Sequence, residues 1–256
     1  MLNVMSSPEH LPRLFIPLDA TPGPAEAGTS CTLSPAQARY LGTVMRKKAG
    51  DPVRVFNASI GEWLASLGEI RKDRGSLTLT QQLRAPSVQP DLVLAFALLK
   101  RDATDMVLRM GTELGVTHFL PVITERTNTH RTNPERLEAI ATEAAEQCER
   151  LDIPTIAEPC PLASLLGAWP EGARLFTAME RTEDRGVTLN VSLQQARAGD
   201  GLLIGPEGGF SDTECRALLA RPAIAPISLG PLVLRADTAV AAGLALMGQS
   251  LRSAQD

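Results

Sequence analysis

The sequence predicts an α/β protein in which a small β-barrel precedes a domain with a mainly parallel sheet. Short apolar runs separated by Gly, Asp, Asn or Pro fill the first 85 residues, whereas from residue 92 onward apolar strands alternate with helical segments. Between the two parts, residues 85–90 contain two prolines and no apolar periodicity, which is typical of a linker. A chain of 256 residues is long enough for two domains, and we place them at residues 1–85 and 86–256.

The first domain is expected to be mostly β-structure. One helix interrupts its strands, because Ser34 is a suitable N-cap and Pro35 fits the first helical position. Short strands with turn residues between them and a single helix favour a small barrel. The expected strands are residues 13–18, 52–56, 62–67 and 76–81.

The second domain begins with a continuous apolar run, residues 92–99, of the kind found in strands buried on both faces. A helix from about residue 103 to 113 should end at Gly115, a favourable residue just beyond a helix. Ser211 and Glu214 form a capping box that opens a later helix. The remaining expected strands are 118–123, 173–178, 201–204 and 226–229, and the remaining helices run from about 134 to 150 and from about 236 to the end of the chain.

The charge of the chain is unevenly distributed. With 25 basic and 29 acidic residues the formal charge is −4, which argues against a protein that simply coats nucleic acid. Residues 1–85, however, carry 10 basic and 7 acidic residues, a net +3, while residues 86–256 carry 15 and 22, a net −7. Arginine accounts for 21 of the 25 basic residues, which suits bidentate phosphate contacts but is equally consistent with an arginine-rich genome. Because only 4% of residues are aromatic, base stacking is not the expected mode of recognition.

Several classes of protein are excluded. The four cysteines are scattered without metal-ligand spacing, so neither a zinc site nor a disulfide framework is expected. No apolar run approaches the ~20 residues of a membrane span, and the first residues do not resemble a signal peptide. A cytoplasmic setting is therefore expected. The dinucleotide-binding fingerprint, the P-loop and the G-x-S-x-G elbow are all absent from the sequence.

Two strand ends carry the residues most suited to a ligand, since ligands of open parallel sheets bind beyond the carboxyl ends of strands. The strand at 201–204 runs directly into Gly205 and further glycines, although an ordinary tight turn would also explain them. The second segment, residues 227–238, passes through Gly230 and delivers Arg235 and Asp237 to the start of a helix. Both segments are apolar and lack phosphate-binding lysines. They suit a neutral or cationic adenosine-bearing ligand better than ATP.

Arg235 stands where a cation does not help the helix, because the N-terminal end of a helix dipole is positive. The residue either forms a salt bridge with Asp237 or Glu207, or stabilises negative charge on a substrate. The small residues of 236–248 permit the close approach of another helix, and a well-packed core helix would explain them equally well.

The segment Ile204-Gly-Pro-Glu-Gly-Gly-Phe210, followed by Ser228-Leu-Gly-Pro-Leu-Val-Leu-Arg235, resembles the last two motifs of the ribosomal RNA small subunit methyltransferase E family. That family belongs to the SPOUT methyltransferases, which have a trefoil-knotted α/β fold. The sequence departs from the family in having Asp237 where Glu is usual, and Leu232 where a basic or β-branched residue is usual. The resemblance extends through Lys100, 111–116, 125–127, 143–150 and 153–154, and residues 13–15, 44–46 and 50–51 look like the family's PUA-like RNA-binding module.

The resemblance implies that the protein transfers a methyl group from S-adenosylmethionine to N3 of a uridine in 16S ribosomal RNA. It implies a role for Arg235 in stabilising charge on the uracil carbonyl oxygens, and for Asp237 or Glu207 in accepting the N3 proton. Arg13 and Arg46 are expected to contact RNA phosphates, with no metal required. The residues expected to line the cofactor pocket are Met179, Ile204, Gly205, Leu229, Gly230 and Leu234.

The partners implied are 16S ribosomal RNA or the small ribosomal subunit, and a second copy of the chain in a homodimer that involves the last helix. A non-catalytic RNA-binding ribosome assembly factor, with the methyltransferase fold retained, is the alternative that Asp237 leaves open.

Overall fold

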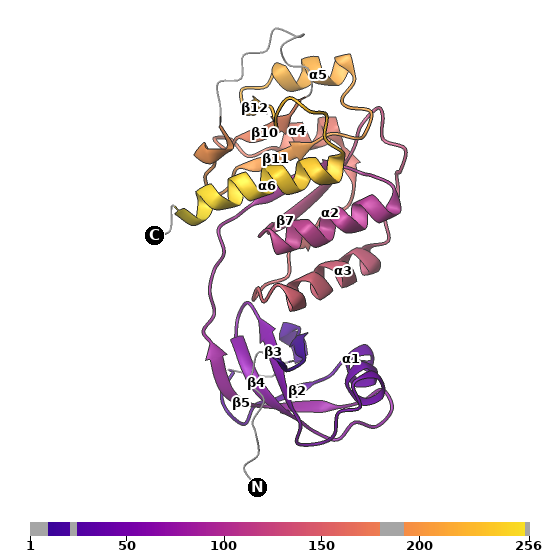
Figure 1. Cartoon of the computed structure of the whole chain (residues 1–256), viewed down its shortest axis with the longest axis vertical. Helices are drawn as coiled ribbons and strands as arrows, with labels where there is room; N and C mark the ends of the chain where they lie inside the picture. Colours follow the sequence, from indigo (N-terminus) through magenta and orange to yellow (C-terminus); the bar gives the residue numbers. More distant parts are fainter. Residues whose placement is uncertain (1–9, 21–24, 180–191, 254–256) are drawn as a thin grey trace. The chain divides into compact units, whose positions relative to one another are not determined.

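The computed structural model describes residues 10–20, 25–179 and 192–253 (Figure 1). The chain forms two compact units. The N-terminal unit consists of the residues up to 88 together with 145–153, and the C-terminal unit consists of 89–144 and the residues from 154 onward. Residues 145–153 include the last turn of a helix that begins in the C-terminal unit. We describe the two units separately.

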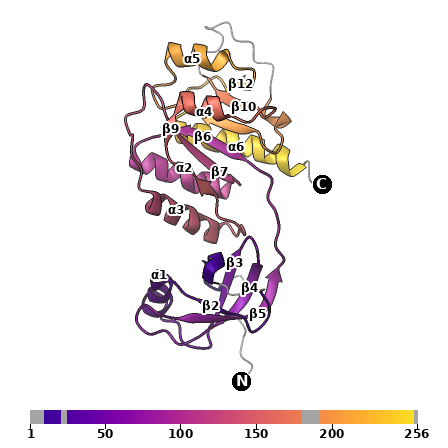
Figure 2. The same cartoon turned by 180° about the vertical axis from the view of Figure 1, so that it is seen from behind.

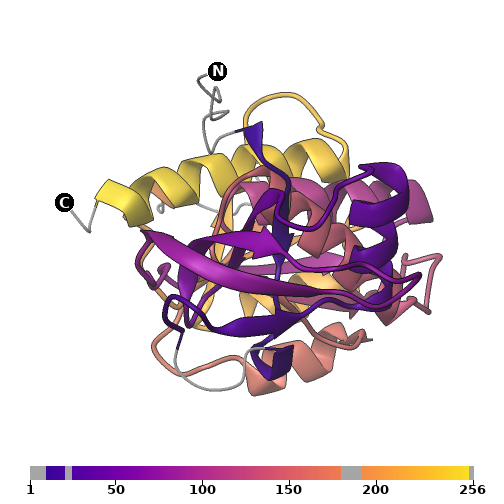
Figure 3. The same ribbon diagram turned by 90° about the horizontal axis from the view of Figure 1, so that it is seen from below.

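The N-terminal unit is built on a five-stranded curled sheet around one apolar core (Figure 3). The strands lie in the order β1-β3-β4-β5-β2, with β1 parallel to β3 and the other pairs antiparallel. The alternation of buried and exposed residues in β5 shows why this sequence forms a strand with one face on the core. The bounds are β1 (Arg13–Phe15), β2 (Ser30–Thr32), β3 (Pro52–Asn57), β4 (Gly61–Leu67) and β5 (Ser76–Arg84).

The four strands expected in this unit are confirmed, and β2 is an addition that the sequence pattern did not indicate. A strand of three residues, with Cys31 alone buried, is too short to show alternation. The expected helix is confirmed as α1 (Pro35–Arg39), with Ser34 and Gln37 forming a reciprocal capping box. The chain continues through a π-helical turn, η3 (Tyr40–Val44), and a short 3₁₀ turn, η2 (Leu18–Ala20), follows β1.

A buried carboxylate organises the charged side chains of this unit. Glu62, whose side chain is 2% exposed, accepts hydrogen bonds from Arg13 Nε at 2.9 Å and from Arg84 Nε at 2.6 Å. Arg54 Nη1 lies 3.3 Å from the same carboxylate and 2.8 Å from that of Glu149. The hydrogen bond from Arg54 lowers the pKa of Glu149 from its ordinary value. Arg13, Arg54 and Arg84, three of the ten basic residues in 1–85, therefore form ion pairs inside this unit.

The C-terminal unit is a parallel sheet with helices on both faces (Figures 1 and 2). The strand order is β12-β10-β11-β6-β7-β8, every pair is parallel, and the short β9 also pairs with β7. The parallel α/β arrangement predicted from the alternation of strands and helices is therefore confirmed. The strands are β6 (Val93–Ala97), β7 (His118–Ile123), β8 (Thr155–Ile156), β9 (Cys160–Pro161), β10 (Leu175–Ala178), β11 (Gly201–Ile204) and β12 (Ile224–Ile227).

The helices divide between the two faces of the sheet. One apolar cluster joins alternate strand residues to α2, α3 and α6, and a second joins the intervening residues to α4 and α5. This explains why the strands read as continuous apolar runs, since both faces are covered. The helices are α2 (Arg101–Glu113), α3 (Pro134–Gln147), α4 (Leu162–Ala168), α5 (Asp212–Leu219) and α6 (Ala236–Ser253), and a 3₁₀ turn, η5 (Leu193–Gln195), precedes β11.

Three details differ from the sequence analysis. The last strand lies at 224–227, two residues earlier than expected, and α3 ends at Gln147 instead of near residue 150. Helix α4 was not expected, although the spacing of Leu162, Leu165 and Leu166, all buried, matches one helical face. The trefoil knot that the resemblance implies stays a prediction.

Two properties hold for the residues that the structure describes. No helix among them is long and apolar enough to cross a bilayer. Nor do their histidine, cysteine, aspartate and glutamate side chains form a group of three or more that would hold a metal ion.

Candidate active site

The carboxyl ends of three neighbouring strands bring together residues that are far apart in the sequence. Strand β10 lies between β11 and β12, with Thr177 opposite Leu203 and Ala178 opposite Ile227. Beyond the last pair, the Met179 N–H donates to the Ile227 carbonyl at 3.1 Å. Because parallel strands end at the same edge of the sheet, Met179, Ile204 and Leu229 reach one region of that edge. We call this region the strand-end site.

The connection from β12 to α6, residues 228–235, is held by its own side chains and backbone. The Ser228 hydroxyl donates to the Gly230 carbonyl and accepts from the Gly230 N–H, both at 3.2 Å. Gly230 has φ +120°, a conformation that requires glycine. Leu229 and Leu234 are half-buried against the core, and their backbone N–H groups donate to no other residue in the described part of the chain. The connection therefore offers apolar side chains together with backbone donors.

The turn after β11 is explained largely by packing inside the protein. A Cβ on Gly205 would stand 3.0 Å from the Phe210 ring, so this glycine makes room for an aromatic side chain. Gly209, with φ +66°, closes the turn by donating to the Pro206 carbonyl at 2.8 Å. The alternative of a tight strand-to-helix turn thus accounts for these two glycines, while Ile204 and the backbone of Gly205 still lie at the strand-end site.

The same turn is fixed to the connection that follows β7. The expected capping box of α5 is confirmed, with the Ser211 hydroxyl accepting from the Glu214 N–H at 3.1 Å and Glu214 accepting from the Ser211 N–H at 2.9 Å. Glu214 also accepts from the Glu125 N–H at 2.8 Å. Arg126 Nη1 donates to the Gly208 carbonyl at 2.6 Å. These hydrogen bonds therefore hold the connection after β7 and the turn after β11 together at this edge of the sheet.

Arg235 and Asp237 stand at the start of α6, as the sequence analysis expected. The Arg235 carbonyl accepts from the Ala239 N–H at 2.8 Å, which makes Arg235 the N-cap residue. Its exposed guanidinium forms no ion pair with Asp237, with Glu207 or with any other residue that the structure describes. The salt-bridge alternative is therefore not found here.

The two candidate proton acceptors differ in their surroundings. Asp237 is half-buried, and its Oδ1 accepts from the Thr238 N–H at 2.7 Å and from the Thr238 hydroxyl at 3.4 Å. Glu207 is exposed in the turn after β11. The edge thus combines an unpaired cation with two carboxylates, which is suited to stabilising negative charge and accepting a proton.

The two arginines expected to contact phosphate have different surroundings. Arg46 is exposed, has φ +53° and stands two residues after the end of η3. Arg13 is only 7% exposed, and its guanidinium donates to Glu62, to the Ala145 carbonyl at 2.8 Å and to the Arg150 carbonyl at 2.7 Å. It also covers the Phe56 ring at 3.5 Å. The Arg13 guanidinium is therefore used inside the unit, which argues against a phosphate contact, and the expected role of Arg13 stays a prediction.

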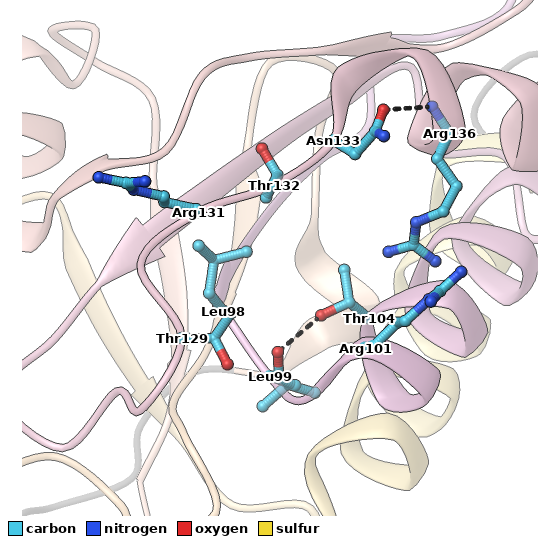
Figure 4. Close-up of a pocket in the computed structure, with 9 residues that line it drawn as sticks. All are labelled: Leu98, Leu99, Arg101, Thr104, Thr129, Arg131, Thr132, Asn133 and Arg136. Carbon is cyan, nitrogen blue, oxygen red and sulfur yellow. Dashed lines mark hydrogen bonds between the residues drawn. The ribbon is translucent and has the colours of Figure 1, made fainter.

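A cavity at the same edge of the sheet was missed by the sequence analysis (Figure 4). It has a volume of about 360 Å³ and lies just beyond the end of β6, beside residues 129–136 of the segment that leads from β7 into α3. Arginines at 101, 131 and 136, which closely follow the apolar run 92–99 or flank the helix start at Asn133-Pro134, were the signal in the sequence that could have located it. The cavity, which we call the arginine pocket, is lined by Leu98, Leu99, Arg101, Thr104, Thr129, Arg131, Thr132, Asn133 and Arg136.

Comparisons with known proteins agree with the fold. Residues 87–248 match a family described as the RNA methyltransferase domain, and residues 33–80 match the RNA methyltransferase PUA domain. The fold and site thus define an RNA methyltransferase that carries a PUA domain. The chain is 34% identical over 206 residues to the ribosomal RNA small subunit methyltransferase E of Rickettsia conorii, covering 80% of this chain and 84% of that protein. It belongs to the ribosomal RNA small subunit methyltransferase E family.

Other relatives give the same result. The Synechocystis protein of this name is 34% identical over 230 residues, covering 87% of this chain and 74% of that protein. A putative methyltransferase from Legionella pneumophila, solved with bound S-adenosylmethionine, is 27% identical with a TM-score of 0.78, covering 94% of this chain and 98% of that one. The Neisseria gonorrhoeae family member, also bound to S-adenosylmethionine, has a TM-score of 0.80 at 23% identity over 94% of this chain and 98% of that one, and shows the fold.

Proposed function

We propose that this RNA methyltransferase transfers a methyl group from S-adenosylmethionine to N3 of a uridine in 16S ribosomal RNA. The observation that supports this most strongly is the strand-end site. There the ends of β10, β11 and β12 adjoin one another, and an arginine without a carboxylate partner stands at the start of α6. Membership of a family of ribosomal RNA methyltransferases supports the class of substrate.

The chemistry of the strand-end site fits S-adenosylmethionine. The proposed lining consists of apolar side chains and of backbone donors at Leu229 and Leu234, a set suited to a neutral adenine ring and to the uncharged part of the ligand. A triphosphate site would favour a lysine, and residues 202–210 and 227–238 contain none. When bound, the cofactor supplies an activated methyl group on a sulfonium. The residues proposed to hold it are Met179, Ile204, Gly205, Leu229, Gly230 and Leu234.

The target atom sets the task of the protein side chains. N3 of uridine carries a proton between two carbonyl groups, so it becomes a good nucleophile only as that proton leaves. The negative charge then spreads onto the carbonyl oxygens, where the Arg235 guanidinium stabilises it. Arginine remains protonated and does not serve as the base. Asp237 or Glu207 accepts the N3 proton, directly or through water, while the new N–CH₃ bond replaces the sulfonium–CH₃ bond.

The proposed partners follow from the same assignment. The proposed substrate is 16S ribosomal RNA, alone or in the small ribosomal subunit, and the proposed location is the cytoplasm. The side chain of Arg46 is exposed and can contact an RNA phosphate. We also propose a homodimer. The connection that leads into α6 carries Leu232 and Val233, which are 77% and 70% exposed, and two adjacent apolar side chains this exposed support a surface that a second copy covers.

Nucleoside mass spectrometry tests the proposal. The purified protein, S-adenosylmethionine and 16S ribosomal RNA or small subunits from a strain lacking the enzyme should yield N3-methyluridine. Arg235→Ala should lower turnover roughly 100- to 1000-fold, the usual loss for a group that stabilises developing charge. Its affinity for S-adenosylmethionine, measured by calorimetry, should stay unchanged.

Two results would count against this assignment. Absence of N3-methyluridine with a protein that still binds RNA would favour a non-catalytic assembly factor. Equal losses of turnover and cofactor affinity in Arg235→Ala would assign Arg235 to cofactor binding or folding. Arg235→Lys, which keeps the charge but not the bidentate geometry, serves as the conservative comparison.

A further inference from the structure

The arginine pocket is a second feature of the edge that carries the strand-end site. Its apolar floor is Leu98 and Leu99, both buried, which follow β6. Its walls come from the start of α2 and from residues 129–136, which lead from β7 into α3. Figure 4 shows Arg101 and Arg136 on one side of the pocket and Arg131 on the other. The lining thus combines three guanidinium groups with hydroxyl and amide groups.

The positive charge of the pocket is largely uncompensated. No carboxylate lines the pocket. Among the described residues, the only ion pair that involves a lining residue joins Arg136 to Asp105. Arg101 and Arg131 are exposed and pair with no residue in the described ranges. This cationic pocket lies in a part of the chain, residues 86–256, that carries 22 acidic and 15 basic residues. General basic character therefore does not explain it.

The backbone and the small polar side chains also favour an anion. Helices α2 and α3, of 13 and 14 residues, both begin at the pocket. Lys100, the N-cap of α2, makes no side-chain capping bond, so the first N–H groups of this helix have no capping partner, and such groups bind anions well. The hydroxyls of Thr129 and Thr132 make no hydrogen bond with another described residue. Each is a potential donor to a phosphate oxygen.

The pocket is held in place relative to the strand-end site. Strand β6 lies between β11 and β7 in the sheet. The connection after β7 is fixed to the turn after β11 by the hydrogen bonds from Arg126 to Gly208 and from Glu125 to Glu214. A single extended ligand that crosses this edge therefore meets both places. A polynucleotide is long enough to contact both the strand-end site and the arginine pocket, whereas a small anion would occupy the pocket alone.

We propose that the arginine pocket binds a backbone phosphate of the substrate RNA, close to the nucleotide that enters the strand-end site. The proposal rests on the proposed function for the identity of that RNA. Arg101 and Arg131 provide the charge, and the start of α2 with Thr129 and Thr132 provides neutral donors. Arg136 contributes less, because Asp105 neutralises it. The pocket positions the RNA and takes no part in methyl transfer.

The test compares RNA binding by the full-length wild type and by the Arg101→Gln/Arg131→Gln variant. Affinity for the 16S RNA substrate, measured without cofactor across a range of salt concentrations, should fall about tenfold or more at physiological salt, because the variant lacks two charged donors. The slope of log K against log salt should become shallower by about 0.7 for each single-strand phosphate that the variant no longer neutralises. KM for RNA should rise more than kcat changes, and S-adenosylmethionine affinity should not change.

Two further variants sharpen the comparison. Arg109→Gln removes an exposed arginine from α2 outside the pocket, and should leave both the affinity and the salt slope close to the wild-type values. Asp105→Asn releases Arg136 from its ion pair, and should tighten RNA binding and steepen the salt slope. Thermal unfolding of each variant separates loss of binding from loss of folding, and Arg101→Lys/Arg131→Lys should keep most of the affinity.

Specific results overturn the proposal. One is an unchanged salt slope and RNA affinity in a folded Arg101→Gln/Arg131→Gln variant. Another is calorimetric binding of inorganic phosphate or uridine monophosphate that disappears in this variant while RNA affinity is unaffected, which would assign the pocket to a small anion. The binding measurements do not depend on methyl transfer. A wild type that binds RNA through the pocket but makes no N3-methyluridine would refute the proposed reaction alone.

Discussion

At the scale of single residues, the surroundings of an arginine decide its role. Burial lowers the pKa of the Arg13 guanidinium, and the adjacent Glu62 carboxylate opposes this shift. Arg13 also donates to backbone carbonyls of residues 145 and 150, more than 130 positions away in the sequence. Arg235, in contrast, is exposed and unpaired among the described residues. Both are arginines beside short apolar runs in the sequence, and only their contacts distinguish them.

Glu62 and the three arginines that surround it, which we call the Glu62 cluster, predict that a single substitution has a large effect on stability. Glu62→Gln removes a charge that is shared by Arg13, Arg54 and Arg84 and leaves buried cations uncompensated. The free energy of unfolding of the N-terminal unit should fall by about 3–5 kcal/mol, the usual cost of breaking a buried ion pair. Urea unfolding followed by Trp63 fluorescence, in a Trp169→Phe background, reports on this unit, since Trp63 and Trp169 are the two tryptophans of the chain.

The matched control is Glu69→Gln. Glu69 pairs with Arg71 at 2.9 Å, but both side chains are largely exposed, so its removal should change the free energy of unfolding by at most about 1 kcal/mol. Similar small effects for both variants would mean that the buried cluster does not stabilise the unit.

At the scale of elements, close packing of helices on the sheet explains several glycines. A Cβ on Gly243 of α6 would stand 2.6 Å from the Leu202 side chain of β11. The core-helix explanation of the small residues in α6 therefore holds for this glycine. In α2, a Cβ on Gly111 would stand 2.5 Å from the Phe119 ring, which is fully buried and packs edge-on against Phe96. That ring has little freedom to move.

Gly111→Ala should therefore destabilise the C-terminal unit. Overpacking against the Phe119 ring costs about 1–3 kcal/mol, which exceeds or cancels the gain of up to about 1 kcal/mol in helix propensity. Gly167→Ala in α4 provides the comparison, because nothing lies within 4 Å of its added Cβ. Its melting temperature should be equal to or higher than that of the wild type. A rise in melting temperature for Gly111→Ala, measured by calorimetry, would contradict the packing argument.

At the scale of the whole molecule, the net charge of −4 conceals both acidic and basic surfaces. In the N-terminal unit, Arg13, Arg54 and Arg84 balance buried or partly buried carboxylates, so fewer cations face solvent than the net +3 of residues 1–85 implies. In the acidic C-terminal unit, the arginine pocket and Arg235 place unpaired cations at one edge of the sheet. Local charge is therefore a better guide to an RNA partner than the total.

The proposed homodimer gives a prediction at the same scale. Light scattering after size-exclusion chromatography should give a dimer mass at micromolar concentrations. Leu232→Ser/Val233→Ser should weaken the dimer by at least tenfold, because burying one such side chain contributes about 1.5–3 kcal/mol. Val88→Ser, at a 93% exposed residue in the segment that links β5 to β6, should have no effect. A monomeric wild type would refute the homodimer, and a dimer that resists the double substitution would move the interface elsewhere.

The sequence by itself determined the elements and the most distinctive site motif. Alternation, apolar runs and local capping residues are short-range properties, so α1, the capping box of α5 and the parallel-sheet strands could be predicted from neighbouring residues. The motifs at 204–210 and 228–235 carried the family resemblance.

The tertiary structure decided which distant residues meet. Strand order brought Met179, Ile204 and Leu229 to one edge, folding buried Arg13 against Glu62, and loops after two strands formed the arginine pocket. Such contacts depend on the pairing of strands and the burial of charge, which no local pattern encodes.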